Sequence, residues 1–200
     1  MIASTSLCIG ASPLMPARQR NALATRSAIL ACARDRFADE SYDDVSLRDI
    51  AGAVGVDAAL VSRYFGSKED LFLAALESCG DGRELTSGPQ EDFGSRIADD
   101  ILLKPQRADK LKGMSIVLRS IGSTRASEIV RSSCARRFLD PLAEWLGGSD
   151  AAVRARLLAG VIMGMSISRD ISPADFDLSP EDSDIMRDRL AKMLQYAVDG

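Results

Sequence analysis

The amino-acid sequence predicts an all-α protein. Apolar residues recur at helical spacing from residue 25 onward, and no long alternation of polar and apolar residues indicates a strand. Clusters of glycine, proline and acidic residues divide the chain into helix-sized segments. Of its 200 residues 46% are hydrophobic and 27% are charged, so one or two domains can bury a core without disulfides. We find no unbroken apolar run of about 20 residues, and we therefore expect no membrane partner.

The N-terminal segment, residues 1–22, is expected to be a mobile extension. It contains Pro13 and Pro16 and shows no sustained period. No basic stretch precedes its short apolar patch, so a cleaved signal peptide is not expected. The first helix is expected over residues 26–38, with Thr25 as its N-cap.

Residues 45–72 predict a helix-turn-helix and the start of a following helix. The helices are expected over residues 47–54, over residues 58–64 and from residue 68 onward. Helices of about eight residues, separated by three or four, meet the spacing that a helix-turn-helix requires. The residues that cap or separate these helices are Ser46, Asp49, Gly55, Asp57, Gly66 and Ser67.

A second, larger helical domain is expected after these helices. The glycine-rich stretch 80–92 marks the weakest point of the chain. Pro141 should kink or restart the helix that contains it, and Ser179 with Pro180 begins the last helix. The expected helices cover residues 93–103, 108–121, 125–146, 150–167 and 180–198. The expected division is an extension (1–22), a helix-turn-helix domain (23–72) and a second helical domain (73–200), with the fourth helix bridging the two domains.

The absence of histidine excludes a large share of enzyme chemistry. Ser-His and Cys-His nucleophiles and His-ligated zinc all need an imidazole. The four cysteines occur singly with no C-x-x-C, so we expect no metal, no cofactor and a reducing cytoplasmic location. A carboxylate enzyme remains an alternative, but the adjacent Asp99 and Asp100 point apart on a helix.

The net charge of −4 is unusual for a nucleic-acid-binding protein. The charge is unevenly distributed, because residues 1–34 carry four arginines and no acidic residue. A locally basic surface is therefore compatible with the acidic average.

The segments TRSAILACARDRF (residues 25–37) and VSLRDIAGAVGVDAALVSRYFGSKEDLF (residues 45–72) resemble the N-terminal domain of the TetR family of bacterial transcriptional regulators. The family pattern has T-x-x-D-I-A-x-x-A-G-V-S, an aromatic-phenylalanine pair and S-K-E-x-L. The matching positions are Ser46, Asp49, Ile50, Ala51, Gly55, Val56, Tyr64, Phe65, Ser67, Lys68, Glu69 and Leu71. The resemblance implies a ligand-responsive repressor that binds a palindromic double-stranded DNA operator as a homodimer.

The candidate DNA-binding residues follow from the resemblance and from their chemistry. Arg48 can fork onto guanine O6 and N7, and Ser46 can cap its helix, contact a phosphate, or both. Leu60 meets a thymine methyl group or belongs to the core, and Ser62 stands where the family often has a tyrosine. Arg18 and Arg20 are candidates for an adjacent minor groove. The remaining candidates are Arg26, Ala58, Ala59, Arg63, Tyr64 and Lys68.

The resemblance implies dimerisation through the last two helices, whose apolar stripes could equally be intramolecular core. Gly160 and Gly164 would let a second helix approach closely. The other candidates for this interface are Val153, Leu157, Val161, Ile185, Arg189, Met193 and Tyr196.

The middle helices could line a pocket for a small apolar or amphipathic effector, as the resemblance implies, or simply form core. The candidate lining residues are Ile97, Ile101, Met114, Val117, Leu118, Ile121, Phe138, Leu142, Trp145 and Met163. Arg119 and Arg137 could meet an anionic group or pair with a neighbour. A protein-interaction module without DNA binding remains the second alternative function.

Overall fold

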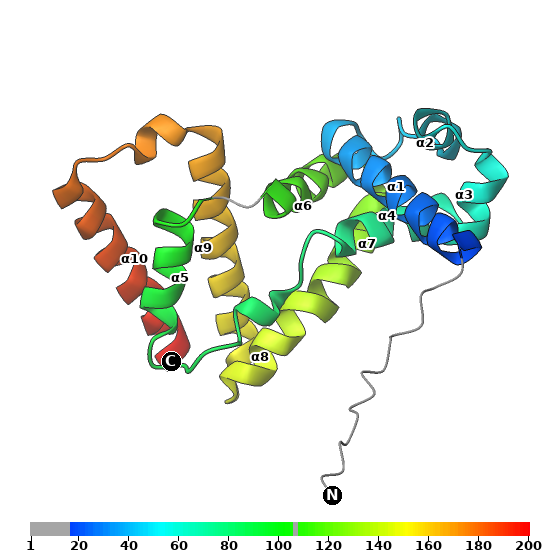
Figure 1. Cartoon of the computed structure of the whole chain (residues 1–200). Helices are drawn as coiled ribbons and strands as arrows, with labels where there is room; N and C mark the ends of the chain where they lie inside the picture. The colour runs from blue at the N-terminus through cyan, green and yellow to red at the C-terminus, as the bar shows by residue number, and fades with distance from the viewer. Residues whose placement is uncertain (1–16, 106–107) are drawn as a thin grey trace, which may run out of the picture.

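The computed structural model describes residues 17–105 and 108–200, which form helices joined by turns and loops (Figure 1). No strand occurs among these residues, so the predicted all-α class is confirmed. The α-helices are α1 (Ala17–Asp39), α2 (Leu47–Val54), α3 (Ala58–Phe65), α4 (Lys68–Glu77), α5 (Phe93–Leu102), α6 (Ala108–Arg119), α7 (Thr124–Cys134), α8 (Asp140–Leu146), α9 (Ala151–Ile171) and α10 (Pro180–Asp199). Short 3-10 turns lie at η1 (Gly82–Glu84), η2 (Ser120–Gly122) and η4 (Pro173–Phe176).

Helix α1 begins earlier than the sequence analysis expected. It starts at Ala17, so Thr25 lies inside the helix and is not its N-cap. The Thr25 hydroxyl donates to the Asn21 carbonyl at 2.8 Å, which is how a threonine is accommodated within a helix. Residues 17–24 are rich in good helix formers, so the helix continues through this segment. The expected extension through residue 22 is thus wrong for residues 17–22, and residues 1–16 lie outside the described chain.

The caps of α2 and α3 are those that the sequence predicts. The Ser46 hydroxyl accepts from the Asp49 amide at 3.2 Å, and the Ser46 amide donates to the Asp49 carboxylate at 3.0 Å. Gly55 ends α2 with a φ of +76°, a left-handed conformation that favours glycine. The Asp57 carboxylate accepts from the Ala59 amide at 2.7 Å and so caps α3.

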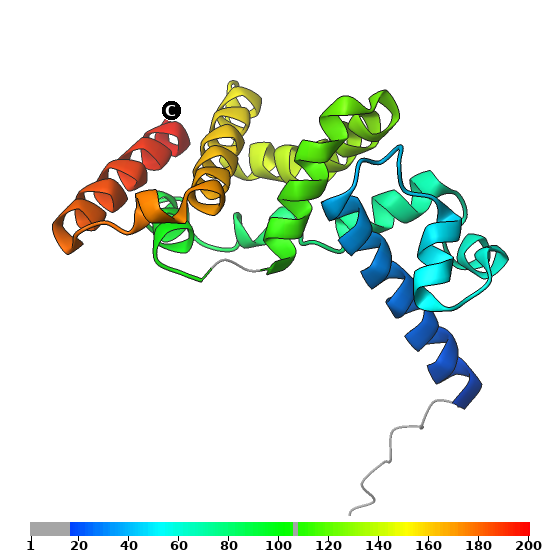
Figure 2. The same ribbon diagram turned by 90° about the horizontal axis from the view of Figure 1, so that it is seen from above.

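Two separate hydrophobic cores hold these helices together. The first joins α1 to α4 with α6 and α7, and its fully buried side chains include Ile29, Phe37, Ile50, Val61 and Phe72. The second joins α5, α8, α9 and α10, and its buried side chains include Phe93, Leu142, Leu158 and Leu194. Figures 1 and 2 show α1 to α4 at one end of the molecule and α5, α9 and α10 at the other.

A π-turn (η3, Ala135–Leu139) joins α7 to α8 just ahead of Pro141. Proline has no amide hydrogen to donate to the carbonyl four residues earlier, so a regular α-helix cannot continue through it. The Asp140 amide instead donates to the Ala135 carbonyl, five residues back. The expected disturbance is confirmed, and it takes the form of a π-turn.

Helix α9 is long and apolar enough, by length and composition, to cross a membrane, which the sequence analysis did not expect. It is nevertheless packed against α5, α8 and α10. Its Arg154 is buried and donates to the Asp150 carboxylate and to the Val198 carbonyl. Packing against α5, α8 and α10 therefore accounts for only part of the apolar composition of α9, and the apolar side chains that stay exposed need a separate explanation.

Candidate DNA-binding surface

Helix α3 turns small and polar side chains outward. Val61 is fully buried and anchors the helix on the first core, while Ala59, Ser62 and Arg63 are exposed. Leu60 is half-buried, so it is neither a fully exposed leucine nor a central core residue. In Figure 1, α2 and α3 form the outer edge of the molecule, farthest from α9 and α10. A duplex can approach this edge without meeting another helix.

Two polar residues at the start of α2 differ in their availability. Arg48 is exposed, and no hydrogen bond or ion pair is recorded for it in the described part of the chain. The Ser46 hydroxyl also donates to the Asp49 carboxylate at 2.6 Å, so the capping box uses its one donor and one of its two acceptor lone pairs. The Ser46 hydroxyl therefore serves the cap, whereas the Arg48 side chain is available to an outside partner and its contact with DNA stays a prediction.

Three candidate cations rest on aromatic rings. The Arg26 guanidinium lies 4.7 Å from the Phe65 ring centroid, and the Arg63 guanidinium lies 5.7 Å from that of Tyr64. The Lys68 ammonium lies 4.3 Å from the Tyr42 ring centroid, and Tyr42 is itself buried. Such contacts restrict the rotamers of long side chains, so their charges are held near α3 before DNA arrives.

A carboxylate caps the start of each of the helices α2, α3 and α4. Asp49 and Asp70 complete capping boxes with the preceding serines, and Asp57 caps α3. Hydrogen bonds from Ser46 lower the pKa of Asp49, and hydrogen bonds from Ser67 lower the pKa of Asp70. The capping roles of Asp49 and Asp57 were predicted from the sequence, whereas the position of acidic groups among the candidate DNA contacts was not.

Ion pairs and hydrogen bonds hold the helix-turn-helix unit against α6. Arg34 of α1 pairs with Asp109 at 3.0 Å, and the Lys112 ammonium donates to the Asp35 carboxylate. Arg119 donates to the Ala38 carbonyl at 2.7 Å. Arg119 therefore makes a structural contact with a backbone carbonyl, which is neither of the two partners expected for it.

Further ties join α4 to the rod formed by α7, η3 and α8. Arg125 pairs with Glu69 at 2.9 Å near the start of α4, and Arg136 donates to Glu77 at 2.6 Å near its end. Arg137 donates to the Glu77 carbonyl at 2.8 Å and also to the Gly80 carbonyl. Both ends of α4 are thus fastened to the second half of the chain, through contacts that are distant in sequence.

Comparison with known proteins identifies the family. The profile described as "Bacterial regulatory proteins, tetR family" matches residues 29–75, and the profile described as "Tetracyclin repressor-like, C-terminal domain" matches residues 91–198. The chain belongs to the TetR family. It is therefore a DNA-binding transcriptional regulator and not an enzyme.

The chain is also similar to individual proteins of known function or structure. The HTH-type transcriptional repressor AcnR of Corynebacterium glutamicum is 28% identical over 143 residues, which cover 70% of this chain and 68% of AcnR. The crystal structure of NalD, the secondary repressor of the MexAB-OprM multidrug efflux pump in Pseudomonas aeruginosa, has a TM-score of 0.65 at 20% identity and covers 86% of this chain and 96% of NalD. A SmeT–triclosan complex has a TM-score of 0.62 at 23% identity and covers 85% of this chain and 91% of SmeT.

The structure does not bring the expected effector residues of this TetR-family chain into one site. Ile97, Ile101 and Leu142 are buried in the second core, where Trp145 packs against Phe93 at 5.4 Å between ring centroids. Val117 instead packs on the first core. Met114 and Phe138 are half-buried, whereas Leu118, Ile121 and Met163 are exposed. Periodicity correctly showed apolar faces but could not show that they belong to different cores.

Two surface hollows are lined by other residues. One, of about 560 Å³, lies between α1 and α2 and is lined by Ala28, Cys32, Asp35, Arg36, Asp39, Glu40, Ala53 and Val54. The other, of about 500 Å³, is lined by Gln90, Glu91, Leu146, Gly147, Gly148, Arg154, Val198 and Asp199. Neither hollow contains a residue expected to contact the effector.

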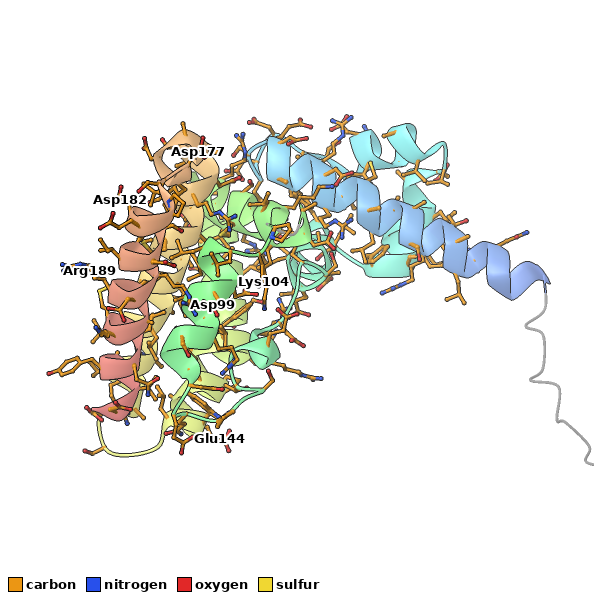
Figure 3. The ribbon with its side chains drawn as sticks, turned by 60° about the vertical axis from the view of Figure 1, so that its left-hand side comes forward. Asp99, Lys104, Glu144, Asp177, Asp182 and Arg189 are labelled. Carbon is orange, nitrogen blue, oxygen red and sulfur yellow. The ribbon has the colours of Figure 1, made fainter. Side chains whose placement is uncertain are left out.

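The expected dimer residues are mainly exposed on α9 and α10. Val161 is the exception, because it is half-buried against the second core. In Figure 3, Arg189 points away from the body at the outer edge of α10, whereas Asp99 lies on the neighbouring helix α5. The exposed members are Val153, Leu157, Gly160, Gly164, Ile185, Arg189, Met193 and Tyr196.

Asp99 and Asp100, the alternative catalytic pair, have different partners. Asp99 accepts from Arg187 of α10, whereas Asp100 accepts from Lys104 at 3.1 Å and from Lys110 at 3.0 Å. The two carboxylates therefore serve as separate structural ion pairs.

Proposed function

We propose that the protein is a homodimeric repressor that binds a palindromic operator in the cytoplasm and leaves it when a small apolar or amphipathic effector binds. The observation that carries the dimer is the exposed apolar surface of α9 and α10. Tyr196 is 77% exposed, Val153 59% and Leu157 58%. Large apolar side chains gathered on one face are typical of a protein–protein interface.

The spacing on α9 indicates a helix partner. Val153, Leu157, Gly160, Gly164 and Ile171 recur at intervals of three, four and seven residues and so share one face. A Cβ added at either glycine would meet no atom within 4 Å, so the space beside these two positions is open in the single chain. A second copy of α9 or α10 can therefore approach this face at close range, which also accounts for the apolar composition of α9.

The interface is tested by the variant Gly160→Arg. A Cβ added at Gly160 would meet no atom within 4 Å, and the change replaces a helix-interior glycine, so the fold is expected to be retained. We expect the wild-type chain to sediment as a dimer and the variant to sediment as a monomer with native helicity. Gly122→Arg, a matched change at an open, exposed glycine in η2, should leave the dimer intact. A Gly160→Arg protein that remains dimeric would rule out this interface.

The symmetry of the operator follows from the dimer, and repression is supported by the relatives. A two-fold axis places two copies of α3 about one helical turn of DNA apart, or a multiple of it, so an operator with matching half-sites is expected. AcnR and NalD are both named as repressors, which supports repression here.

The effector response rests on the division into two cores. Helices α6 and α7 share the first core with α1 and α4. Helix α6 and the turn η3 both contact α9, which belongs to the second core. A ligand held between the two cores would shift α6 and α7. The ion pairs and hydrogen bonds of α6 with α1, and of α7 and η3 with α4, would pass this shift to the helix-turn-helix unit. The SmeT neighbour was solved with triclosan, which supports a small aromatic effector.

The effector is tested by release of DNA. Triclosan is the first probe, followed by a panel of uncharged aromatic compounds, each titrated into the protein bound to a labelled duplex selected from genomic fragments. At least one compound should weaken binding about tenfold, within the usual range of allosteric coupling. A panel in which no compound changes the affinity would count against the effector and leave DNA binding unaffected.

A further inference from the structure

We propose that Asp57, the N-cap of α3, selects a cytosine in each half-site of the operator. This inference rests on the assignment of α3 as the DNA-reading helix. It adds a base-selecting role to a residue whose recorded role is structural.

The carboxylate of Asp57 is only partly used by the cap. One oxygen, Oδ1, accepts from the Ala59 amide at 2.7 Å, and the residue is exposed. Over residues 17–105 and 108–200, no ion pair and no other side-chain hydrogen bond is recorded for Asp57. The second oxygen is therefore available to a partner outside the chain.

The surroundings of Asp57 let this oxygen reach the DNA. The three residues that follow, Ala58, Ala59 and Leu60, have apolar side chains, so Asp57 is the one polar side chain at the start of α3. The two alanines are short and allow the helix end to approach the bases closely. The N-terminal residues of a recognition helix are those that contact base edges in the major groove.

The chemistry of a carboxylate leaves one base as its best partner. An ionised carboxylate accepts hydrogen bonds and donates none, so it repels the phosphates and the acceptor edges of guanine and thymine. Donors in the major groove are the amino groups of cytosine and adenine. Adenine also presents its N7 acceptor beside the amino group, whereas cytosine does not, so cytosine is favoured.

The cap alone does not require the negative charge of Asp57. Serine and asparagine cap helices about as well as aspartate. A negative charge at a surface that binds DNA lowers the affinity for DNA unless a hydrogen-bond donor of a base pairs with it. A cytosine amino group at the right position supplies that donor, and any other base there leaves the charge without a partner.

The experiment compares the full-length wild type with Asp57→Asn and Asp57→Ser in rounds of selection from a pool of randomised double-stranded DNA. Both variants keep the cap, so their unfolding midpoints should equal that of the wild type. Asp44→Asn is the matched control, because it removes one exposed carboxylate from the same domain outside α3.

We expect wild type and Asp44→Asn to enrich a cytosine at one position of each half-site, with about a tenfold preference over other bases. Asp57→Asn should change that position to adenine, because an amide pairs with adenine N6 and N7. Asp57→Ser should lose the preference there and bind random DNA more tightly.

Two results would overturn the proposal in distinguishable ways. If the wild type and both Asp57 variants select the same base at every position, the role of Asp57 is wrong and DNA reading by α3 stands. If the wild type enriches no sequence at all, the role of α3 in reading DNA fails, and the role of Asp57 fails with it.

Discussion

Replacing Arg48 by alanine tests whether α2 contributes a base contact. Arg48 is exposed, and no partner for its guanidinium is recorded in the described residues, so its removal breaks no intramolecular tie. The free energy of unfolding should therefore change by no more than about 0.5 kcal/mol. A guanidinium that forks onto guanine contributes about 1–3 kcal/mol of discrimination, which is about a 5- to 150-fold loss of affinity.

The assay for Arg48 is fluorescence anisotropy of a labelled operator duplex, repeated with each base pair changed in turn. Arg48→Ala should bind the operator more weakly and become insensitive to the base pair at one position of each half-site. Arg83→Ala is the control, because Arg83 is an almost fully exposed arginine of η1, outside the helix-turn-helix unit. An Arg48→Ala protein that binds every duplex as the wild type does would refute the base contact.

Three further outcomes follow from the structure. Gly94→Ala should destabilise the second core by about 3 kcal/mol, because its Cβ would lie 2.2 Å from the Ala191 carbonyl oxygen; an unchanged urea midpoint would contradict this packing of α5 on α10. Lys68→Met should weaken binding to all duplexes alike and lower the slope of log affinity against log salt by about 0.9, the value for one lost phosphate contact; an effect confined to one base pair would argue against that role. The pKa values of Asp49 and Asp70 are lowered in the folded state, so the stability from their caps is complete above the unfolded pKa, about 3.9, and is lost as the pH falls through the lowered folded values. In thermal melts, Asp49→Asn should lose less stability on acidification than the wild type, and identical curves would exclude the Asp49 cap as a cause of the acid sensitivity.

Local signals predicted the helix-turn-helix unit closely. The capping boxes at Ser46 and Ser67 and the turn at Gly55 each depend on a few neighbouring residues, so the sequence contains all the information that they need. The start of α1 was missed because Thr25 has the chemistry of a cap, and only the preceding helix formers indicate that the helix continues.

Long-range packing could not be predicted from the sequence. An apolar stripe shows that a helix buries one face but not against which partner. The sequence therefore left Ile97 and Val117 as residues of either a pocket or the core, and could not show that they lie in different cores. The roles of Arg119 and Arg137 depend on carbonyl groups more than 50 residues away, which no periodicity reveals. The shared helical spacing of the glycines and apolar residues of α9 indicates one apolar face, but it left open whether that face is core or interface.

The most direct test of the account is the number of chains bound to one operator duplex. Sedimentation of the full-length protein with a duplex selected from genomic DNA, together with a footprint of the protected bases, gives both the stoichiometry and the spacing. The account predicts two chains per duplex and two matching half-sites whose centres lie about 34 Å apart, or a multiple of that distance. One chain per duplex, or protection without a repeated half-site, would contradict it.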